Sequence, residues 1–146
     1  MAELPDPYCD AVLVGSIPVA TVYETDRVWA FHHPRPSFDP VHIVLIPKEH
    51  VDSLVTLRSR DVDLQLEVLH ALSVLGEEVV RAHGECQMHV NLGHYLHSGH
   101  LHIHVTSDPR IRTFPPDGDD DAHSHRWATE GARGWAEYWR AHSPRA

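Results

Sequence analysis

Three histidines at alternate positions are the residues of this sequence best suited to chemistry. His100, His102 and His104 are separated by the apolar residues Leu101 and Ile103. In a strand, successive side chains point to opposite faces, so the three imidazoles would share one face, about 6.6–6.8 Å apart, while the apolar residues face the core. Because imidazole attacks phosphorus, binds metal and changes charge near neutral pH, this face predicts a chemical role.

Three interpretations of this histidine face are open. In phosphate chemistry the central ring attacks phosphorus and neighbouring donors stabilise charge on the non-bridging oxygens. In a metal site two or three ring nitrogens bind zinc, and a carboxylate, thiolate or water completes a tetrahedron. The third interpretation is a solvated, histidine-rich strand. The chain holds 15 histidines. We interpret five of them as surface residues: His70, His83, His123, His125 and His142.

The elements that must position these rings are strands and one long helix. Residues 21–31 form two β-branched and aromatic runs around the turn-prone segment 25–27, which predicts a β-hairpin. The continuous apolar run within 41–47 predicts a central strand buried on both faces. Residues 88–92 and 99–106 are two further strand candidates.

Apolar residues between Ser59 and His83 recur at the spacing of a helix that buries one face. They are Val62, Leu66, Leu69, Ala71, Leu72, Leu75, Val79 and Val80. Gly84 stands where a left-handed cap would end this helix. Five strands and one major helix, with neighbouring strands in order, predict an α+β domain with a mostly antiparallel sheet.

The C-terminal part of the chain has a different composition. From residue 108 it is acidic and rich in Pro and Gly, which predicts a linker, and 132–142 has the aromatic spacing of a short helix. We therefore predict one domain over 1–107, and an extension over 108–146 that is not an independent domain.

Composition excludes several classes of partner. The chain has 12 basic and 21 acidic residues, a net charge of −9 and only one lysine, so it lacks the positive surface that nucleic acid requires. No apolar stretch approaches the roughly 20 residues needed to cross a bilayer. Two isolated cysteines, Cys9 and Cys86, and no secretory segment lead us to expect a cytoplasmic protein that contacts neither nucleic acid nor membrane.

The run H-L-H-I-H-V-T (100–106) resembles the signature of the histidine triad superfamily, in its Hint-like branch. Residues 15–31 resemble the first hairpin of that family, 41–54 its central strand and following turn, and 90–93 the strand before the triad. The resemblance covers roughly residues 8–107. It implies a HIT-like α+β fold with a short N-terminal helix, commonly a homodimer, and hydrolysis or transfer on nucleoside phosphoramidates or related nucleotide conjugates. The alternative is a histidine triad protein that binds a nucleotide or small phosphate ligand without catalysis.

The resemblance also implies roles for individual residues. His102 matches the nucleophile that forms a nucleotidyl-histidine, His100 and His104 flank it, and His42 matches a histidine that hydrogen-bonds the nucleophile and fixes its tautomer. The implied substrate contacts are Phe31 and His32, with Val12 less certain, as the wall of a nucleoside pocket, and Asn91 near the phosphate.

The sequence departs from the family at the substrate loops. Leu96 and His97 stand where glutamine and a phosphate-contacting serine are usual, and Ser98 substitutes only if the loop is shifted. His33 replaces the acidic residue that holds the ribose hydroxyls, and it cannot accept two hydroxyl hydrogen bonds as a carboxylate does. We therefore include His33, His97 and Ser98 among the substrate-binding residues and leave the identity of the substrate open.

Some members of the family bind a structural zinc through Cys-x-x-Cys near the N-terminus. Here Cys9 is present, but Asp6 occupies the position of its partner. Asp6, Cys9, His50 and a triad histidine compose a site only if all four converge. We expect no cofactor and no catalytic metal, with this structural zinc as the alternative.

Overall fold

A computed structural model of the chain describes residues 3–111, 134, 137–138 and 140–142. By contacts, the chain divides into the unit Met1–Asp108 and the unit Pro109–Ala146. All strands and long helices described below lie in the first unit. Of the helix expected over 132–142, the described residues 134, 137–138 and 140–142 are helical, and the other five lie outside the described residues. Within the part of the chain that is described, no helix is long and apolar enough to span a bilayer.

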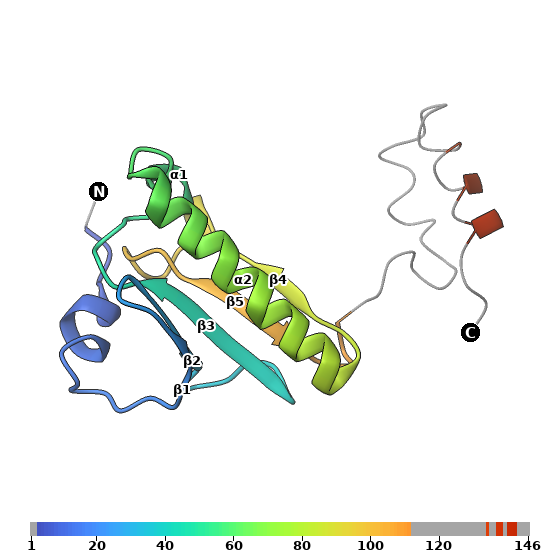
Figure 1. Cartoon of the computed structure of the whole chain (residues 1–146), viewed down its shortest axis with the longest axis horizontal. Coiled ribbons are helices and arrows are strands. Elements are labelled where there is room, and N and C mark those ends of the chain that lie inside the picture. Colours follow the sequence, from blue (N-terminus) through green and yellow to red (C-terminus); the bar gives the residue numbers. More distant parts are fainter. Residues whose placement is uncertain (1–2, 112–133, 135–136, 139, 143–146) are drawn as a thin grey trace. The chain divides into compact units, whose positions relative to one another are not determined.

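The first unit is a five-stranded antiparallel sheet with one long helix across one face (Figure 1). The order of strands in the sheet is β1-β2-β3-β5-β4, and each neighbouring pair is antiparallel. The strands are β1 (Thr21–Glu24), β2 (Val28–His32), β3 (Val41–Pro47), β4 (Gln87–His89) and β5 (Ile103–Ser107). The predicted α+β class and hairpin are confirmed.

Strand β3 is the centre of the sheet. It pairs with β2 on one side and β5 on the other, and all seven of its residues are buried. Side chains alternate along it, so Ile43 and Leu45 pack in the cluster beneath the long helix, while Val44 and Ile46 pack in a cluster on the opposite face. The predicted central strand, buried on both faces, is confirmed.

The long helix α2 (Val62–His83) has a capping residue at each end. The Asp61 carboxylate accepts a hydrogen bond from the Leu64 N–H, which satisfies one of the unpaired donors of the first turn. At the other end Gly84 has φ +85°, and its N–H donates to the Val80 carbonyl. Because residues with a side chain rarely adopt this left-handed backbone conformation, glycine suits the end of the helix, as the sequence predicts. The short helix α1 (Leu54–Leu57) precedes it.

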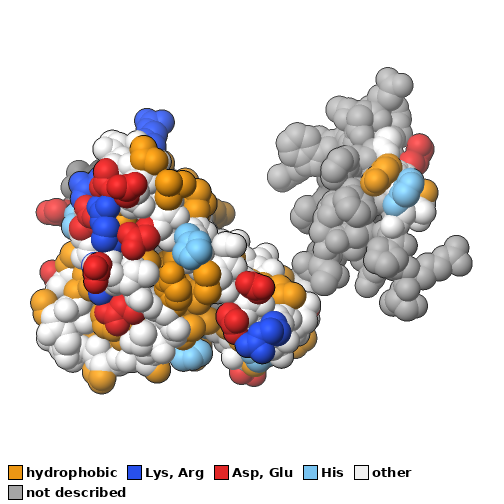
Figure 2. All heavy atoms as spheres, in the orientation of Figure 1, with side chains coloured by type: hydrophobic (Ala, Val, Ile, Leu, Met, Phe, Trp, Pro, Cys, Tyr) orange, Lys and Arg blue, Asp and Glu red, His pale blue; other side chains and the backbone are white. Residues whose placement is uncertain are grey.

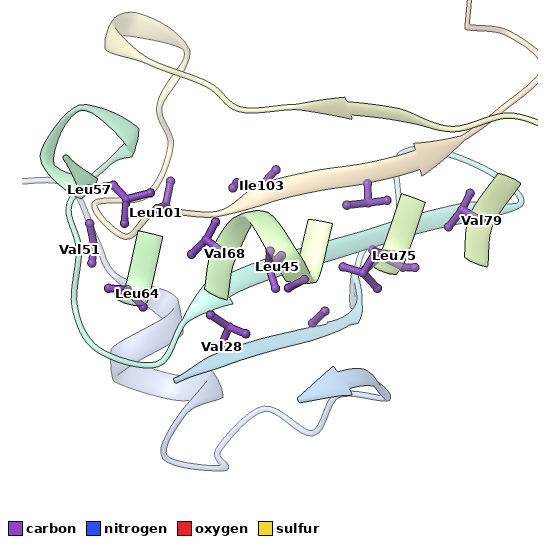
Figure 3. Packing of buried hydrophobic residues seen from close by; sticks show 14 of the residues in the cluster. Val28, Leu45, Val51, Leu57, Leu64, Val68, Leu75, Val79, Leu101 and Ile103 are labelled. Atoms are coloured by element: carbon purple, nitrogen blue, oxygen red, sulfur yellow. The ribbon is translucent and has the colours of Figure 1, made fainter. Parts of the chain in front are cut away.

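The buried face of α2 differs from the predicted one. The residues packed on the sheet are Leu64, Val68, Ala71, Leu75 and Val79 (Figure 3). Four predicted core residues instead stay exposed: Val62 at 65%, Leu66 at 57%, Leu69 at 63% and Val80 at 48%. Apolar residues occupy more than one side of this helix. Spacing alone therefore assigned half of the eight predicted residues to the wrong face. Figure 2 shows hydrophobic side chains at the outer surface of the molecule, on the side where α2 lies.

A short N-terminal helix, η1 (Tyr8–Val12), belongs to the opposite face of the sheet. Its residues Tyr8 and Val12 pack with Phe31, Val44 and Ile46 in a second buried cluster. The predicted short N-terminal helix is therefore present, and it covers the sheet face that α2 leaves free.

The two strands near the triad are shorter than predicted. Strand β4 ends at His89, so Asn91 lies in the segment that leads to the short helix η2 (Gly93–Tyr95). Strand β5 begins at Ile103, so His100 and His102 precede it. The reason is that the backbone before β5 bonds to other segments: the Gly99 N–H donates to Pro5 O and the Leu101 N–H donates to Val51 O. The apolar residues of the run, Leu101 and Ile103, still enter the core.

Candidate active site

His102 and His104 form the centre of the candidate site. Their ring centroids are 5.1 Å apart with nearly perpendicular planes, at an interplanar angle of 79°. His104 lies on β5 and His102 lies directly before that strand. The two residues are 8% and 9% exposed, so both rings are largely withdrawn from water yet reachable. A buried pair of imidazoles with little access to solvent is suited to chemistry on a small bound group.

One hydrogen bond fixes the tautomer of His102. Its Nδ1 lies 2.8 Å from the carbonyl oxygen of His100. A carbonyl only accepts hydrogen bonds, so Nδ1 must carry the proton and donate it. The neutral ring then has its lone pair on Nε2. His102 is therefore oriented by the backbone as a nucleophile or a base acting through Nε2.

A second chain of hydrogen bonds fixes His42 and His104. The Ser37 N–H donates to His42 Nδ1 at 2.9 Å, so the proton of His42 is on Nε2. His42 Nε2 then donates to His104 Nδ1 at 2.9 Å, which leaves the His104 proton on Nε2. The prediction that His42 hydrogen-bonds the nucleophile is wrong: its partner is His104, and the nucleophile candidate is oriented by the carbonyl of His100.

Burial keeps these imidazoles uncharged. Desolvation is the largest cause that lowers the pKa of His104, to about 3, and neighbouring imidazoles lower it further. The pKa of His42 falls to about 4 for the same reasons, and burial also lowers the pKa of His102. Neutral rings with fixed tautomers offer one lone pair, on His102 Nε2, and one N–H donor, on His104 Nε2. An electron-rich nitrogen beside a donor is suited to attack on phosphorus and to stabilising its oxygens.

His100 does not share the site of the other two triad residues. Its side chain is fully buried, and Nε2 lies 2.8 Å from the Pro47 carbonyl. On the other side of the ring, Nδ1 lies 3.0 Å from Asp6 Oδ2 and 3.3 Å from Cys9 Sγ. The expectation that His100 flanks the reacting group with its ring is wrong, because both ring nitrogens are engaged elsewhere. It acts on His102 through its backbone oxygen.

Asp6, Cys9, His50 and His100 form a separate cluster with the donor set of a metal site. The four ligand atoms all lie within 4.8 Å of one another. Cys9 Sγ is 3.8 Å from His50 Nδ1, and Asp6 Oδ2 is 2.7 Å from the same nitrogen. Tetrahedral zinc with ordinary bond lengths requires ligand atoms about 3.3–3.8 Å apart, so only small shifts separate the cluster from that geometry.

The outer partners of the cluster also fit a metal. Histidines that bind metal usually donate their other ring N–H to a carboxylate or a backbone carbonyl. In this chain His50 Nε2 lies 2.7 Å from Asp52 Oδ1, and His100 Nε2 faces the Pro47 carbonyl. The Nδ1 atoms of His50 and His100 therefore face Asp6 and Cys9, where both nitrogens could bind a metal.

The predicted substrate contacts are dispersed. Phe31 is fully buried between Tyr8 and Trp29, so it is a core residue in this structure rather than an open pocket wall. His32 is exposed at the end of β2, and Asn91 is partly exposed in its loop. His33 is close to the site, because its ring stacks on His42 with centroids 4.4 Å apart.

The loop before the triad contributes less than expected. Ser98 is buried, and its hydroxyl accepts a hydrogen bond from the His100 N–H at 3.3 Å, so it shapes the loop. His97 is exposed and near enough to affect the pKa of His102 through its charge. Val12 is buried in the second core cluster with Phe31.

Two neighbours of the site were not predicted from the sequence. The His89 ring stacks on His104 with centroids 4.4 Å apart, and Tyr8 lies 5.3 Å from the His102 ring. His89 could have been found, because the predicted strand 88–92 adjoins the triad strand and its alternate residues share a face with His104. No signal in the sequence pointed to Tyr8.

The comparisons with known proteins agree with this fold. Residues 8–113 match the model of the family described as "Scavenger mRNA decapping enzyme C-term binding". A histidine triad protein from Clostridium difficile is 27% identical, with 78% of this chain and 99% of that chain covered and a TM-score of 0.57. The chain is thus a histidine triad superfamily protein, and within that class it belongs to the family of the matching model.

Two solved structures described as HIT family hydrolases share the fold. The one from Legionella pneumophila is 24% identical, with 77% of this chain and 99% of that chain covered and a TM-score of 0.57. The one from Clostridium thermocellum is 20% identical, with 77% and 97% covered and a TM-score of 0.60. At this identity the likeness shows the α+β fold, and the activity of those proteins is not carried over by it.

Proposed function

We propose that this protein hydrolyses or transfers nucleotide conjugates, such as nucleoside phosphoramidates or dinucleoside polyphosphates, through a covalent nucleotidyl-histidine at His102. The observation that carries the proposal is the hydrogen bond from His102 Nδ1 to the His100 carbonyl, which leaves the lone pair on Nε2. The names of the matched family and of two similar structures, a decapping enzyme and HIT family hydrolases, support a phosphate-cleaving activity.

The reaction takes two steps. His102 Nε2 attacks the phosphorus that carries the nucleoside, the N–P bond forms, and the leaving group departs with its bonding electron pair and takes a proton from water. The resulting imidazolium keeps its Nδ1 proton on the His100 carbonyl. Water then attacks the same phosphorus, the N–P bond breaks, one proton returns to solvent, and His102 is again neutral. His104 Nε2–H donates to a non-bridging oxygen in both steps.

The experiment combines turnover with detection of the intermediate. Purified protein is incubated with adenosine and guanosine phosphoramidates and dinucleoside polyphosphates, quenched at alkaline pH, and analysed by intact-mass spectrometry. We expect turnover and a mass increase of one nucleotidyl group, that is, a nucleoside monophosphate less water, both lost in H102A, because the attacking nitrogen is removed. H70A is the matched control, since His70 is an exposed histidine on α2. Tight binding of these compounds without turnover or adduct would instead establish the non-catalytic binding protein.

We propose a structural zinc at Asp6, Cys9, His50 and His100 as a second property of the chain. The convergence of the four ligand atoms and the outer partners of both histidines support it. The ion would supply no chemistry to the reaction. It would tie η1 and the segment before it to His100, two residues before His102, and so hold the His100 carbonyl in place.

Elemental analysis tests this site. We expect about one zinc per chain in the wild type and in C86A, and a loss of zinc in C9A and H50A. Cys86 is the matched control because it is the other free, partly buried cysteine and lies outside the cluster. Equal metal content in C9A and C86A would exclude the site.

A further inference from the structure

Two additional imidazoles lie flat against the hydrogen-bonded pair His42 and His104. His89 stacks on His104 with centroids 4.4 Å apart and planes within 13° of parallel. His33 stacks on His42 at 4.4 Å and 12°. Each ring of the pair therefore has one face covered by another imidazole.

The backbone holds both stacked rings in register with their partners. His89 of β4 is the antiparallel partner of His104 of β5. The His33 N–H donates to the His42 carbonyl at 2.8 Å, which extends the pairing of β2 with β3 by one residue. The Arg35 N–H donates to His33 Nδ1 at 3.0 Å and fixes the orientation of that ring as well. The stacks are therefore built into the sheet.

A single hydrogen bond between two imidazoles leaves one freedom open. The bond from His42 Nε2 to His104 Nδ1 fixes the tautomer only while it is well aligned, and each ring can still turn about its own Cβ–Cγ bond, which bends or breaks this hydrogen bond and releases the tautomer of His104. Turning the His104 ring changes where its Nε2–H points, and a donor must aim at the oxygen it stabilises. A parallel ring against one face removes this rotation.

We propose that His89 and His33 are positioning residues that hold the His42 and His104 rings in one orientation and one tautomer, with the His104 Nε2–H aimed beside the nucleophile. The aim of that proton matters only in the function proposed above, whereas the tautomer is a property of the protein alone. Phe38 also packs on this group of rings, since its ring meets those of His42 and His89 edge-on with centroids 5.1 and 5.7 Å away.

The charge environment supports this role. The imidazoles that act on His104 come from every neighbouring element: His89 on β4, His102 before β5, His42 on β3 and His33 after β2. Protonation of any one of them would place a positive charge against an imidazole, and burial together with these neighbours lowers the pKa of His104. The pair therefore stays neutral, and its tautomers stay fixed, well below neutral pH.

Nitrogen NMR of the full-length protein without substrate tests the proposal. In the wild type we expect His104 and His42 each to show Nε2 protonated and Nδ1 unprotonated, as one tautomer. In H89A, loss of the stack should give a mixture of tautomers for His104 and a higher pKa for that ring, because its face gains water. H89F keeps a flat ring on His104 and should retain the single tautomer. H70A, on α2, should match the wild type.

Kinetics provide the second readout. We expect kcat to fall about 10–100-fold in H89A with KM changed less than 3-fold, and to stay within 3-fold of the wild type in H89F. A folded H89A with the wild-type tautomer and titration of His104 overturns the proposal. If H89A does not fold, a folded H89F that loses the single tautomer overturns it equally. Absence of turnover in the wild type with the tautomers as expected would contradict the proposed function but leave the positioning role intact.

Discussion

At the scale of residues, the chain uses backbone groups to give each imidazole one defined role. The His100 carbonyl forces His102 to carry its proton on Nδ1, and the Ser37 N–H forces His42 to carry its proton on Nε2. His104, which receives the His42 proton, becomes a donor. Three chemically identical side chains thus become a nucleophile candidate, a donor and a link between backbone and donor.

The depressed pKa values of these histidines predict a loss of stability in acid. The unfolded chain has ordinary histidine pKa values near 6.5, whereas the folded pKa is about 3 for His104 and about 4 for His42. Between the folded and unfolded pKa values the unfolded state binds more protons than the folded state. The free energy of unfolding is therefore unaffected by these groups above pH 6.5 and falls as pH decreases toward 4. We expect a loss of about 2 kcal/mol between pH 7 and pH 5, less than two independent shifts would give because the rings are coupled.

Urea unfolding at several pH values measures this loss. H104F should flatten the dependence, because a phenylalanine ring binds no proton in either state. H70A should leave it unchanged. A free energy of unfolding that is constant from pH 7 to pH 5 in the wild type would contradict the assigned burial of these rings.

The residues of the candidate site were only partly predictable. The alternation of histidine with apolar residues located His102 and His104, and the resemblance added His42. The separate position of His100 was not predictable, because it depends on where the strand begins. That start is set by bonds to Pro5 and Val51, which are distant in sequence. The same holds for Phe31, which is covered by a helix 19 or more residues earlier in the chain.

At the scale of elements, the agreement between sequence and structure follows the strength of local signals. Three features were predicted because each has a strong local signal in the sequence. Strand β3 has a continuous apolar run, the hairpin has a polar turn, and α2 ends at a glycine, Gly84, suited to a left-handed conformation. The buried face of α2 was predicted only in part. Apolar residues lie on several sides of the helix, and the choice between sides is made by the sheet.

The corrected helix face predicts opposite effects for two leucines of α2. Leu75 is buried against the sheet, so L75A should cost about 2–5 kcal/mol through lost burial and a cavity. Leu69 is 63% exposed, and L69A should change stability by no more than about 0.5 kcal/mol. Chemical denaturation of both variants gives the comparison. If L69A loses as much stability as L75A, the helix face predicted from spacing alone would be correct instead.

At the scale of the whole molecule, both hydrophobic clusters and the candidate site belong to the unit Met1–Asp108. The family match ends close to this unit, at residue 113. The sequence-based expectation of one domain over 1–107 remains a prediction, as does the homodimer.

Removal of residues 114–146 tests how much of the chain the fold needs. We expect the shortened protein to unfold cooperatively, with a melting temperature within about 4 °C of the full chain, because both described core clusters remain. Thermal unfolding followed by circular dichroism makes the comparison. A shortened chain without a cooperative transition would show that the unit depends on the removed residues.

His100 places an unusual restriction on how this sequence can change over evolutionary time. Its ring belongs to the cluster of Asp6 and Cys9, while its carbonyl orients His102. A substitution there removes the ring from this cluster, and any shift of the local backbone also moves the carbonyl that fixes the tautomer of His102. His97, which is exposed in the loop before the triad, is freer to change than position 100.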